Sequence, residues 1–440
     1  MGHIRYRTRQ EGTRRFAVPG LLLALGMLAA GCAVRAGDAT DVEPGPATVS
    51  VLGTWTGPEL DAFRGVVAPF EAATGITVAY ARTTDLAGEI DRRIAIGDPP
   101  DLAGLAGPAH MERLAQAGVL RDLGASTELD GYLRETAPAF VRLGMVDERL
   151  VGAIVKTTLK GLVWHGRAAA HLGEPDGWDD LVRTAARFST DDTRAWCVGL
   201  GSPGAAGWPG TDWIENILLR QSGTRIWDAW VDGSLPWTAP EIRMAFAAYL
   251  DVVSPGSVAG GTYGALTTDA LAAGDGLFGT PPRCLYTQSA SFQPALFDAQ
   301  GRDPGDDYDF FPMPDFDGGH SGAVEVAGDL VGLFTDRPAA IRLLAWLTGV
   351  EAQRAWVATG GGLSANARVT EYPDRLTQRE AAVLTGASQV RFDASDQMPA
   401  PIEAAFRRAV MDVTAAPERL DEVLADLEAF SAPSGRGPRS

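Results

Sequence analysis

Strand-like and helix-like segments alternate over residues 48–118, and this alternation is the feature that most constrains the fold. Residues 48–53 and 76–80 alternate apolar and polar side chains with the two-residue period of a strand. In 58–74 and 86–96 the apolar residues recur three or four positions apart, as on one face of a helix. Parallel strands need helical crossovers, so we predict an α/β fold whose parallel sheet is covered on both faces.

Capping residues mark the ends of these helices. Gly75 stands where a glycine cap ends the first helix, and Asp85 is a typical N-cap for the second. After a short strand over 102–105, Pro108 opens a third helix. An apolar run typical of strands returns at 323–334, and helical patterns then continue to residue 430.

The first 31 residues have the composition of an export signal. Five arginines and one glutamate precede an apolar run over 16–30, which is too short to span a bilayer comfortably. Small residues then lead into Cys32, and Leu28-Ala29-Ala30-Gly31-Cys32 resembles a bacterial lipobox. That resemblance implies cleavage before Cys32 and a diacylglycerol on its sulfur. An ordinary signal peptide is the alternative. The pair Arg14-Arg15 also resembles a twin-arginine signal, so the export route stays open.

The charge of the mature chain limits its partners. Cleavage after residue 31 removes five of 38 Lys and Arg and one of 56 Asp and Glu, which leaves 33 against 55, a formal charge of −22. Such a charge repels phosphate backbones, so nucleic acid is excluded as a partner. No later segment is long and apolar enough to span a bilayer. We expect 32–47 to be a flexible, lipid-anchored tether and 432–440 a disordered tail.

Two cysteines follow Cys32 in the mature chain. In an oxidising compartment an even pair favours a structural disulfide between Cys197 and Cys284, with two buried free thiols as the alternative.

Five stretches in a shared order then carry a family resemblance. They are Gly53-Thr54-Trp55, Gly97-Asp98-Pro99-Pro100-Asp101-Leu102, Trp178-Asp179-Asp180-Leu181, Glu351-Ala352-Gln353 with Gly361-Gly362-Leu363-Ser364-Ala365-Asn366, and 396–399 before Phe406. Together they resemble the extracellular solute-binding proteins of ABC importers, in the carbohydrate-binding branch that contains maltose-binding protein. The matches cover residues 48–430.

The resemblance implies a two-lobed periplasmic-binding-protein type II fold with hinge strands and an inter-lobe cleft. Lobe one would comprise 48–155 plus 331–375, and lobe two 156–330 plus 376–431. A sugar would be captured in the cleft by hinge closure and delivered to the transmembrane subunits of an ABC permease. We expect a monomer, anchored by lipid to the extracytoplasmic face of the cell membrane, with no cofactor and no metal.

A sugar presents apolar C–H faces and a rim of hydroxyls, which suit aromatic rings and charged hydrogen-bonding groups. The predicted ligand-binding residues at strand ends, lobe crossings and glycine-bounded loops are Trp55, Gly107, Pro108, Lys156, Lys160, Trp208, Asp212, Trp213 and Asp329. Ser289-Ala290-Ser291-Phe292 stands where many relatives carry G-x-W, so an aromatic contact there moves to Phe292 or is lost. Ordinary helix initiation is the alternative for Gly107 and Pro108. Core packing is the alternative for each tryptophan, and a solvated pair is the alternative for the two lysines. Trp227 and Trp230 lie three apart on a helix, which favours the core.

Signals of catalysis are few. The chain has no G-x-S-x-G elbow, no H-E-x-x-H motif and no complete phosphate loop, and its histidines lack metal-ligand spacing. We therefore predict a binding module and not an enzyme. A cationic peptide or polyamine is the alternative ligand, favoured by the negative charge. A surface glycosidase is the alternative from another class, because 55 acidic residues always offer some carboxylate pair.

Overall fold

The computed structural model describes residues 47–202, 205–360 and 362–431, which belong to one compact unit. The predicted signal peptide, Cys32, the tether up to residue 46 and the predicted tail lie outside the described residues. Within the described ranges, no helix is both long enough and apolar enough to cross a membrane.

One sheet gathers strands from distant parts of the chain. Its members are β1 (Thr48–Gly53), β2 (Thr77–Arg82), β3 (Leu102–Gly104), β6 (Gly152–Leu159), β11 (Ala323–Leu333) and β12 (Gln389–Phe392). β1 pairs in parallel with β2 and β3, as the alternating pattern predicts. β11 runs antiparallel to β3 and β6 and parallel to β12, so the sheet as a whole is mixed.

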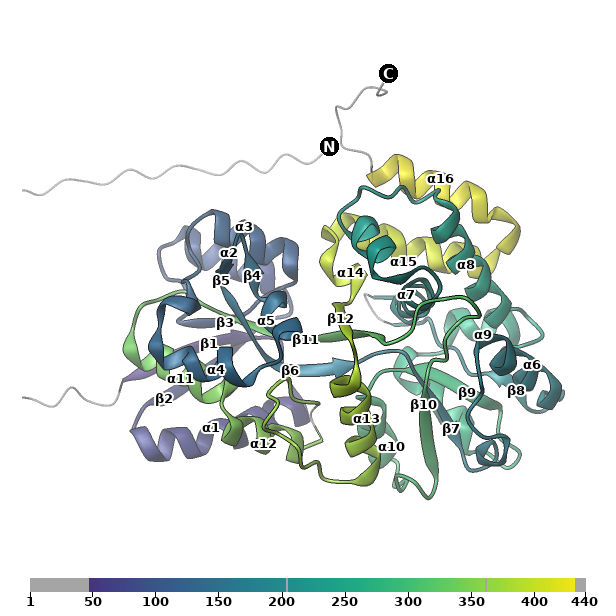
Figure 1. Ribbon diagram of the computed structural model, residues 1–440, viewed down its shortest axis with the longest axis horizontal. Coiled ribbons are helices and arrows are strands. Elements are labelled where there is room, and N and C mark those ends of the chain that lie inside the picture. Colours follow the sequence, from purple (N-terminus) through teal and green to yellow (C-terminus); the bar gives the residue numbers. More distant parts are fainter. Residues whose placement is uncertain (1–46, 203–204, 361, 432–440) are drawn as a thin grey trace, which may run out of the picture. The chain divides into compact units, whose positions relative to one another are not determined.

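Helices cover both faces of this sheet. They are α1 (Gly57–Thr74), α2 (Leu86–Ala95), α3 (Pro108–Gln116), α4 (Asp130–Glu135), α5 (Pro138–Leu143), α11 (Pro338–Thr348) and α12 (Val350–Ala358), with η1 (Leu123–Ala125), η2 (Thr127–Leu129) and the hairpin β4 (Met145–Val146) and β5 (Arg149–Leu150) between them. Figure 1 shows α2 and α3 on one side of the sheet and α1 and α12 on the other. The predicted caps are confirmed: Gly75 is left-handed, with φ 69°, and the Asp85 carboxylate accepts the Gly88 N–H.

A second sheet has the order β10-β7-β9-β8. Its strands are β7 (Leu162–Gly166), β8 (Arg194–Trp196), β9 (Cys284–Ser289) and β10 (Tyr308–Pro312). The accompanying elements are η3 (Ala170–Leu172), α6 (Trp178–Phe188), α7 (Trp208–Val231), α8 (Pro240–Val252), α9 (Gly261–Thr267), η4 (Ala270–Phe278), α10 (Gln293–Asp298), α14 (Ala394–Gln397), α15 (Ala400–Ala415), η5 (Pro417–Arg419) and α16 (Leu420–Ser431). α13 (Arg375–Gly386) leads into β12.

Two hydrophobic clusters fill the unit, and the second sheet packs one face against each of them. Leu162, Trp164 and Phe310 belong to the cluster of the first sheet, and Val163, Tyr286 and Phe311 belong to the other cluster. Val51, Phe63 and Leu343 lie in the core of lobe one, and Phe246 and Phe406 lie in that of lobe two. Trp227 and Trp230 are also buried in lobe two, so the prediction that they are core residues is confirmed.

β6 and β11 form an antiparallel ribbon that connects the lobes (Figure 1). Residues 331 and 332 of β11 pair with both β3 and β6, so these two strands lie on opposite edges of β11. Gly328 permits the close approach within the ribbon, because a Cβ there would lie 2.2 Å from the Lys156 carbonyl oxygen. The predicted lobe limits at 155/156 and 330/331 both fall inside this ribbon and stay predictions.

Cys197 and Cys284 lie at the β8–β9 end of the second sheet. The structure joins their sulfurs in a disulfide, with 5.4 Å between the Cα atoms of residues that are 87 positions apart. Both side chains are buried among the two strands and η4.

We expect the exported protein to carry this bridge in solution. An alkylating agent added under denaturing conditions should label neither Cys197 nor Cys284 until a reductant is present, because a disulfide offers no thiolate. Peptide mapping by mass spectrometry, with and without reduction, measures this. Full alkylation of both residues before reduction would contradict it.

Candidate ligand-binding cleft

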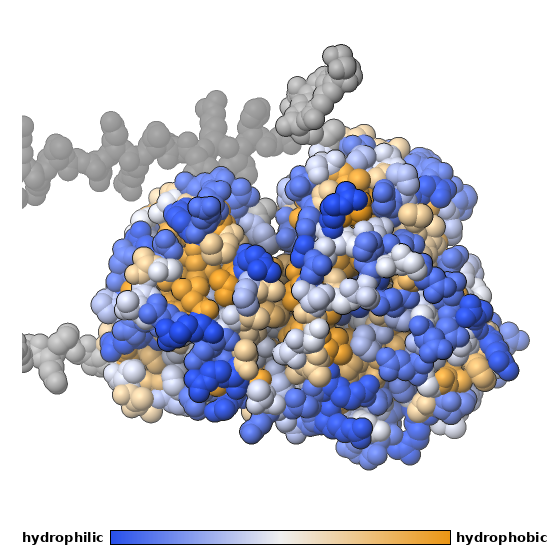
Figure 2. All heavy atoms as spheres, in the orientation of Figure 1, coloured by the Kyte–Doolittle hydropathy of each residue, from blue (hydrophilic) through white to orange (hydrophobic). Residues whose placement is uncertain are grey.

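A cavity of about 490 Å³ opens between the lobes. It adjoins residues 328–330 of β11, on the edge where the Val326 and Leu330 carbonyls accept the N–H groups of Asp393 and Leu105. The carboxyl ends of β3 and β12 therefore meet at this cavity. Figure 2 shows the surface dipping between the lobes. Its walls include Thr54, Leu86 and Gly107 from lobe one, and Asp396, Met398 and Glu403 from the facing side.

The start of α3 brings the two walls together. Gly107 has φ 99°, and a Cβ there would lie 2.5 Å from the Asp396 carbonyl oxygen, so only glycine fits. Pro108 is the first residue of α3 and does not line the cavity. His110 does line it, and its Nδ1 has no partner among the described residues, while its Nε2 lies 3.4 Å from Asp91.

Lys156 and Asp329 face each other across the ribbon, and Glu59 from the start of α1 completes an ion-pair group. Lys156 Nζ hydrogen-bonds to Glu59 and lies 3.7 Å from Asp329 Oδ2. Burial lowers the pKa of Lys156, but the charges of Asp329 and Glu59 outweigh burial, and the pKa is raised. Burial raises the pKa of Asp329, and Lys156 only partly opposes it. This group stays partly exposed, so a ligand hydroxyl can reach it.

Trp55 lies behind this group and not on the cleft surface. It is 6% exposed, and its ring stacks on Tyr80 at 5.9 Å and packs against Phe63 and Trp356. The aromatic neighbours cover its faces, so Trp55 supports the wall from inside lobe one.

Trp208 and Phe292 provide exposed aromatic surface in lobe two. Both rings are half-buried, and their centroids lie 6.2 Å apart at an angle of 55°. Trp208 is the first residue of α7, and Phe292 precedes α10. Trp213, on the same helix, is 1% exposed and packs edge-on against Trp196 at 5.1 Å. The structure therefore places Trp213 in the core of lobe two.

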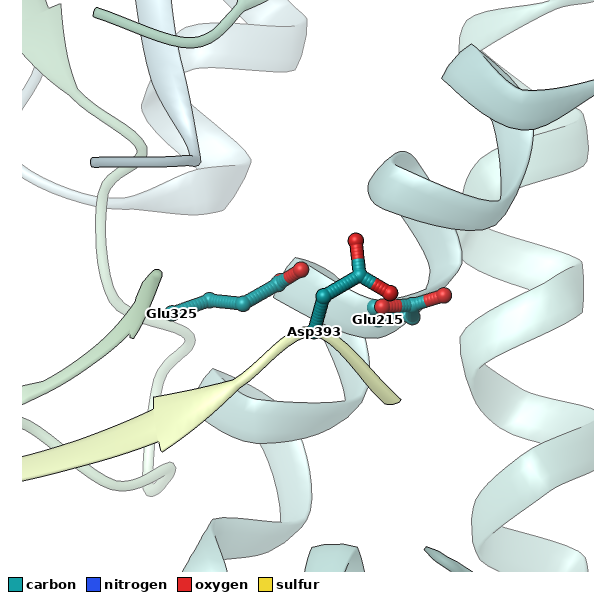
Figure 3. Close-up of side chains that lie close together, drawn as sticks. All are labelled: Glu215, Glu325 and Asp393. Carbon is teal, nitrogen blue, oxygen red and sulfur yellow. The ribbon is translucent and has the colours of Figure 1, made fainter. Parts of the chain in front are cut away.

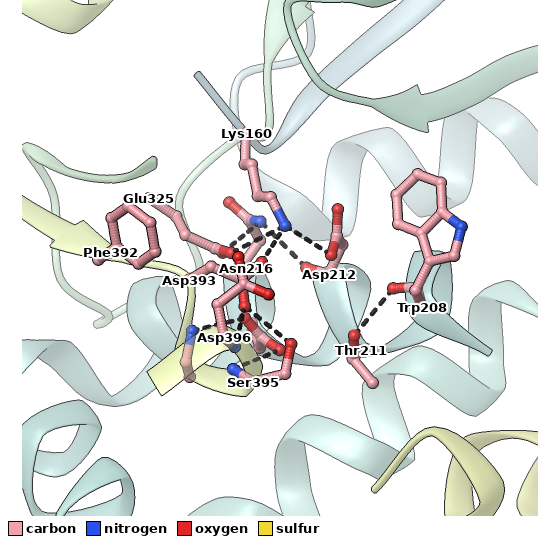
Figure 4. Close-up of polar contacts among 12 residues, drawn as sticks. Lys160, Trp208, Thr211, Asp212, Asn216, Glu325, Phe392, Asp393, Ser395 and Asp396 are labelled. Atoms are coloured by element: carbon pink, nitrogen blue, oxygen red, sulfur yellow. Dashed lines mark hydrogen bonds and ion pairs between the residues drawn. The ribbon is translucent and has the colours of Figure 1, made fainter. Parts of the chain in front are cut away.

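Lys160 lies at the end of β6, inside a buried group of carboxylates. Its Nζ hydrogen-bonds to Asp212 Oδ1 at 2.8 Å and to Asp393, and it lies 4.0 Å from Glu325 Oε1. Figure 4 shows Lys160 pointing into this group, with Trp208 beyond Asp212. Burial lowers the pKa of Lys160, but the three carboxylates raise it well above its usual value. Lys160 and Asp212 thus hold lobe two to the hinge and are closed to a ligand.

Glu215, Glu325 and Asp393 form the only potential metal-ligand group found in the described ranges. Their carboxylate oxygens lie within 4.8 Å of one another, and all three residues are buried (Figure 3). Lys160 already supplies a cation between Asp393 and Glu325, and the Ala394 N–H donates to Glu215. Glu325 Oε1 nevertheless has no hydrogen-bond partner among the described residues, and the absence of a metal stays a prediction.

The same group makes stability depend on pH. Burial, aided by the charge of Asp393, raises the pKa of Glu215 well above its usual value. Burial also raises the pKa of Glu325, although Lys160 and a hydrogen bond with Glu215 oppose this. Both carboxyls hold their protons in the folded state at pH values where the unfolded chain loses them. Unfolding then releases protons, so stability is full below the unfolded pKa and falls as pH rises.

We expect Glu325→Gln to flatten this fall. At pH values above the unfolded pKa of about 4.3, removal of one titrating carboxyl should reduce the slope of the unfolding free energy by up to about 1.4 kcal/mol per pH unit. Urea unfolding at several pH values measures the slope. Glu418→Gln, at an exposed position, serves as the control. Equal slopes in wild type and Glu325→Gln would contradict the expectation.

The predicted site residues thus divide between the surface and the interior. Gly107 and Asp329 line the cavity, and Lys156 pairs with Asp329. Trp208 and Phe292 are half-buried residues of lobe two outside the cavity lining, whereas Trp55, Lys160, Asp212 and Trp213 are buried.

Sequence reasoning missed the acidic partners Glu59, Glu215 and Glu325. The sequence could have indicated the role of Glu325, because an acidic residue inside the apolar run over 323–334 needs a buried partner.

Comparison with known proteins agrees with this architecture. The sequence profile of the bacterial extracellular solute-binding proteins matches residues 55–354. The chain belongs to this family. As a solute-binding protein of that family, it acts outside the cytoplasm.

Two curated relatives cover most of this solute-binding protein. The osmoprotective compounds-binding protein GgtB of Synechocystis is 31% identical over 360 residues, which span 80% of this chain and 85% of the relative. The alpha-glucosides-binding periplasmic protein AglE of Rhizobium meliloti is 31% identical over 382 residues, 83% of each chain.

Solved structures share the two-lobed fold. A chitin oligosaccharide binding protein superposes with a TM-score of 0.73 at 16% identity, covering 88% of this chain and 99% of its own. RafE in complex with raffinose gives 0.68 at 16% identity, with coverages of 88% and 99%.

Proposed function

We propose that this protein is the carbohydrate receptor of an ABC importer and that the sugar binds in the inter-lobe cavity. The observation that carries the proposal is the position of that cavity, at the carboxyl ends of β3 and β12 and beside the hinge ribbon. A ligand there touches both lobes, so we expect binding and hinge closure to be coupled. The volume of about 490 Å³ suits a small oligosaccharide.

The chemistry of the cleft supports a sugar. The half-buried rings of Trp208 and Phe292 lie in lobe two outside the cavity lining, and we propose that they meet the C–H faces of a sugar that extends beyond the cavity. Hydroxyl groups can hydrogen-bond to the ion pair of Lys156 and Asp329. Gly107, which has no side chain, lets a ligand approach the cavity wall closely. The name of AglE, a relative 31% identical, states that it binds α-glucosides, which makes these sugars the first to test.

We also propose that the site binds without catalysis. Hydrolysis of a glycoside needs two carboxyl groups that reach the scissile bond. Glu215, Glu325 and Asp393 are buried and pair with Lys160 or with backbone N–H groups. Asp329, Asp396 and Glu403 do line the cavity, so the proposal rests on the family, whose relatives compared above are binding proteins.

Calorimetric titration of the mature protein with glucosides, galactosides and chitin oligosaccharides tests the proposal. One class should bind with one-to-one stoichiometry and raise the melting temperature, by the linkage of binding to folding. Chromatography of the sugar after long incubation should show no cleavage. A panel in which only a polyamine binds, or in which the sugar is hydrolysed, would overturn the assignment.

We further propose that the receptor is a monomer attached to the membrane through Cys32. Cys32→Ser should abolish incorporation of radiolabelled palmitate, because serine forms no thioether. Val34→Ser, two positions beyond, should retain the label. Labelling that survives Cys32→Ser would refute the anchor.

A further inference from the structure

A second cavity, of about 450 Å³, lies on the other side of the ribbon. Thr157 of β6 pairs with Gly328 of β11 on one edge and with Leu363 on the other. Leu363 lines the second cavity and Gly328 lines the first, so the ribbon separates them. The facing walls come from α10, from β10 and from the start of α13.

Glu380 is buried in the wall of this cavity without a partner. It is 1% exposed, and its buried Oε1 accepts no hydrogen bond from a described residue. Burial, with the nearby charge of Asp374, raises the pKa of Glu380 well above its usual value. A buried carboxyl without a partner costs folding free energy, so its presence beside an open cavity points to a ligand that completes it.

The rest of the wall is acidic and contains no basic side chain among its described residues. Asp298 accepts a hydrogen bond from the Tyr308 hydroxyl at 2.7 Å, and Asp374 caps α13. Arg379, next to Glu380 in sequence, points elsewhere, to Asp309 and the Phe310 carbonyl. The cavity lining therefore has three acidic residues and no basic one, although the Lys156 side chain passes Gly362 of the same wall and the charge of Arg379 acts on Glu380.

We infer that this second cavity binds a small organic cation, an alkyl diamine or polyamine, through Glu380 and Asp298. A lone metal ion fits poorly, because no three acidic side chains of this wall bring oxygens within 4.8 Å of one another. A flexible ammonium compound can instead span separated carboxylates, and its methylenes can cover Pro294, Ala295 and Leu363. The inference goes beyond the proposed function, since the sugar cavity lies across the ribbon.

Titration of the mature protein with putrescine tests the inference, with butane-1,4-diol as the uncharged analogue and calcium chloride as the metal control. We expect saturable one-to-one binding of putrescine, a rise in melting temperature and no binding of the diol. Glu380→Gln, which keeps the shape of the side chain, should weaken putrescine at least tenfold. Asp298→Asn, at an exposed position, should weaken it with folding intact.

Glu403→Gln, in the sugar cavity, is the matched control and should leave putrescine affinity unchanged. Sugar affinity should be the same in wild type and Glu380→Gln. The experiment therefore tests the putrescine site separately from the proposed sugar site. The inference is overturned if putrescine shows no saturable binding or if calcium binds in its place. Equal putrescine binding in wild type, Glu380→Gln and Asp298→Asn would show attraction to overall charge alone and would also overturn it.

Discussion

Lys160→Met should lower the free energy of unfolding by about 3–5 kcal/mol, the usual cost of removing one partner from a buried ion pair. Methionine fills much of the lysine volume but carries no charge. Asp212 and Asp393, which both hydrogen-bond to Lys160, would then face each other in the interior without a cation. The loss is electrostatic, and relaxation of packing cannot repair it.

Lys156→Met is the matched control, four positions earlier and within β6, which ends at Leu159. The Lys156 side chain keeps 14% of its surface exposed and pairs with partly exposed carboxylates, so solvent can replace it. We expect a loss of about 1 kcal/mol or less. Urea unfolding of both variants measures the difference. Addition of Asp212→Asn to Lys160→Met should restore part of the loss, and equal losses in the two lysine variants would refute the role of Lys160.

The sequence could predict the elements whose causes are local. Gly75 and Asp85 act on residues within three or four positions, so their roles as helix caps follow from the sequence and are confirmed. The spacing of Trp227 and Trp230 on one helix likewise predicts burial. The family resemblance, carried by short motifs in order, predicts the two-lobed fold.

The cleft chemistry could not be predicted in the same way, because its contacts join distant residues. Lys160 pairs with Asp212, 52 positions away, and with Asp393, 233 positions away. No local pattern distinguishes this buried lysine from Lys156, which pairs with the partly exposed Glu59 and Asp329. The antiparallel pairing of β11 with β3 also depends on how the chain returns to lobe one, which periodicity does not encode.

Trp208 and Trp213 should separate binding from folding, although both belong to α7. Trp208→Ala should weaken the sugar at least tenfold, because it removes the half-buried ring that faces Phe292 and its stacking surface. Its effect on the melting temperature should be small. Trp213→Ala should instead cost about 3–5 kcal/mol of stability, as deletion of a buried aromatic ring does. Its folded fraction should bind sugar with wild-type affinity.

Trp55→Ala extends the comparison to lobe one. Trp55 is 6% exposed and packs among Tyr80, Phe63 and Trp356, so we expect it to behave like Trp213 and lose stability before affinity. Calorimetric affinity is measured beside a melting curve for the three variants. The affinity reports contact of the ring with the sugar, and the melting temperature reports packing of the ring in the core. If Trp208→Ala keeps full affinity while Trp55→Ala loses it in a fully folded protein, the aromatic platform lies in lobe one. The sugar would then contact the opposite wall from the one proposed here.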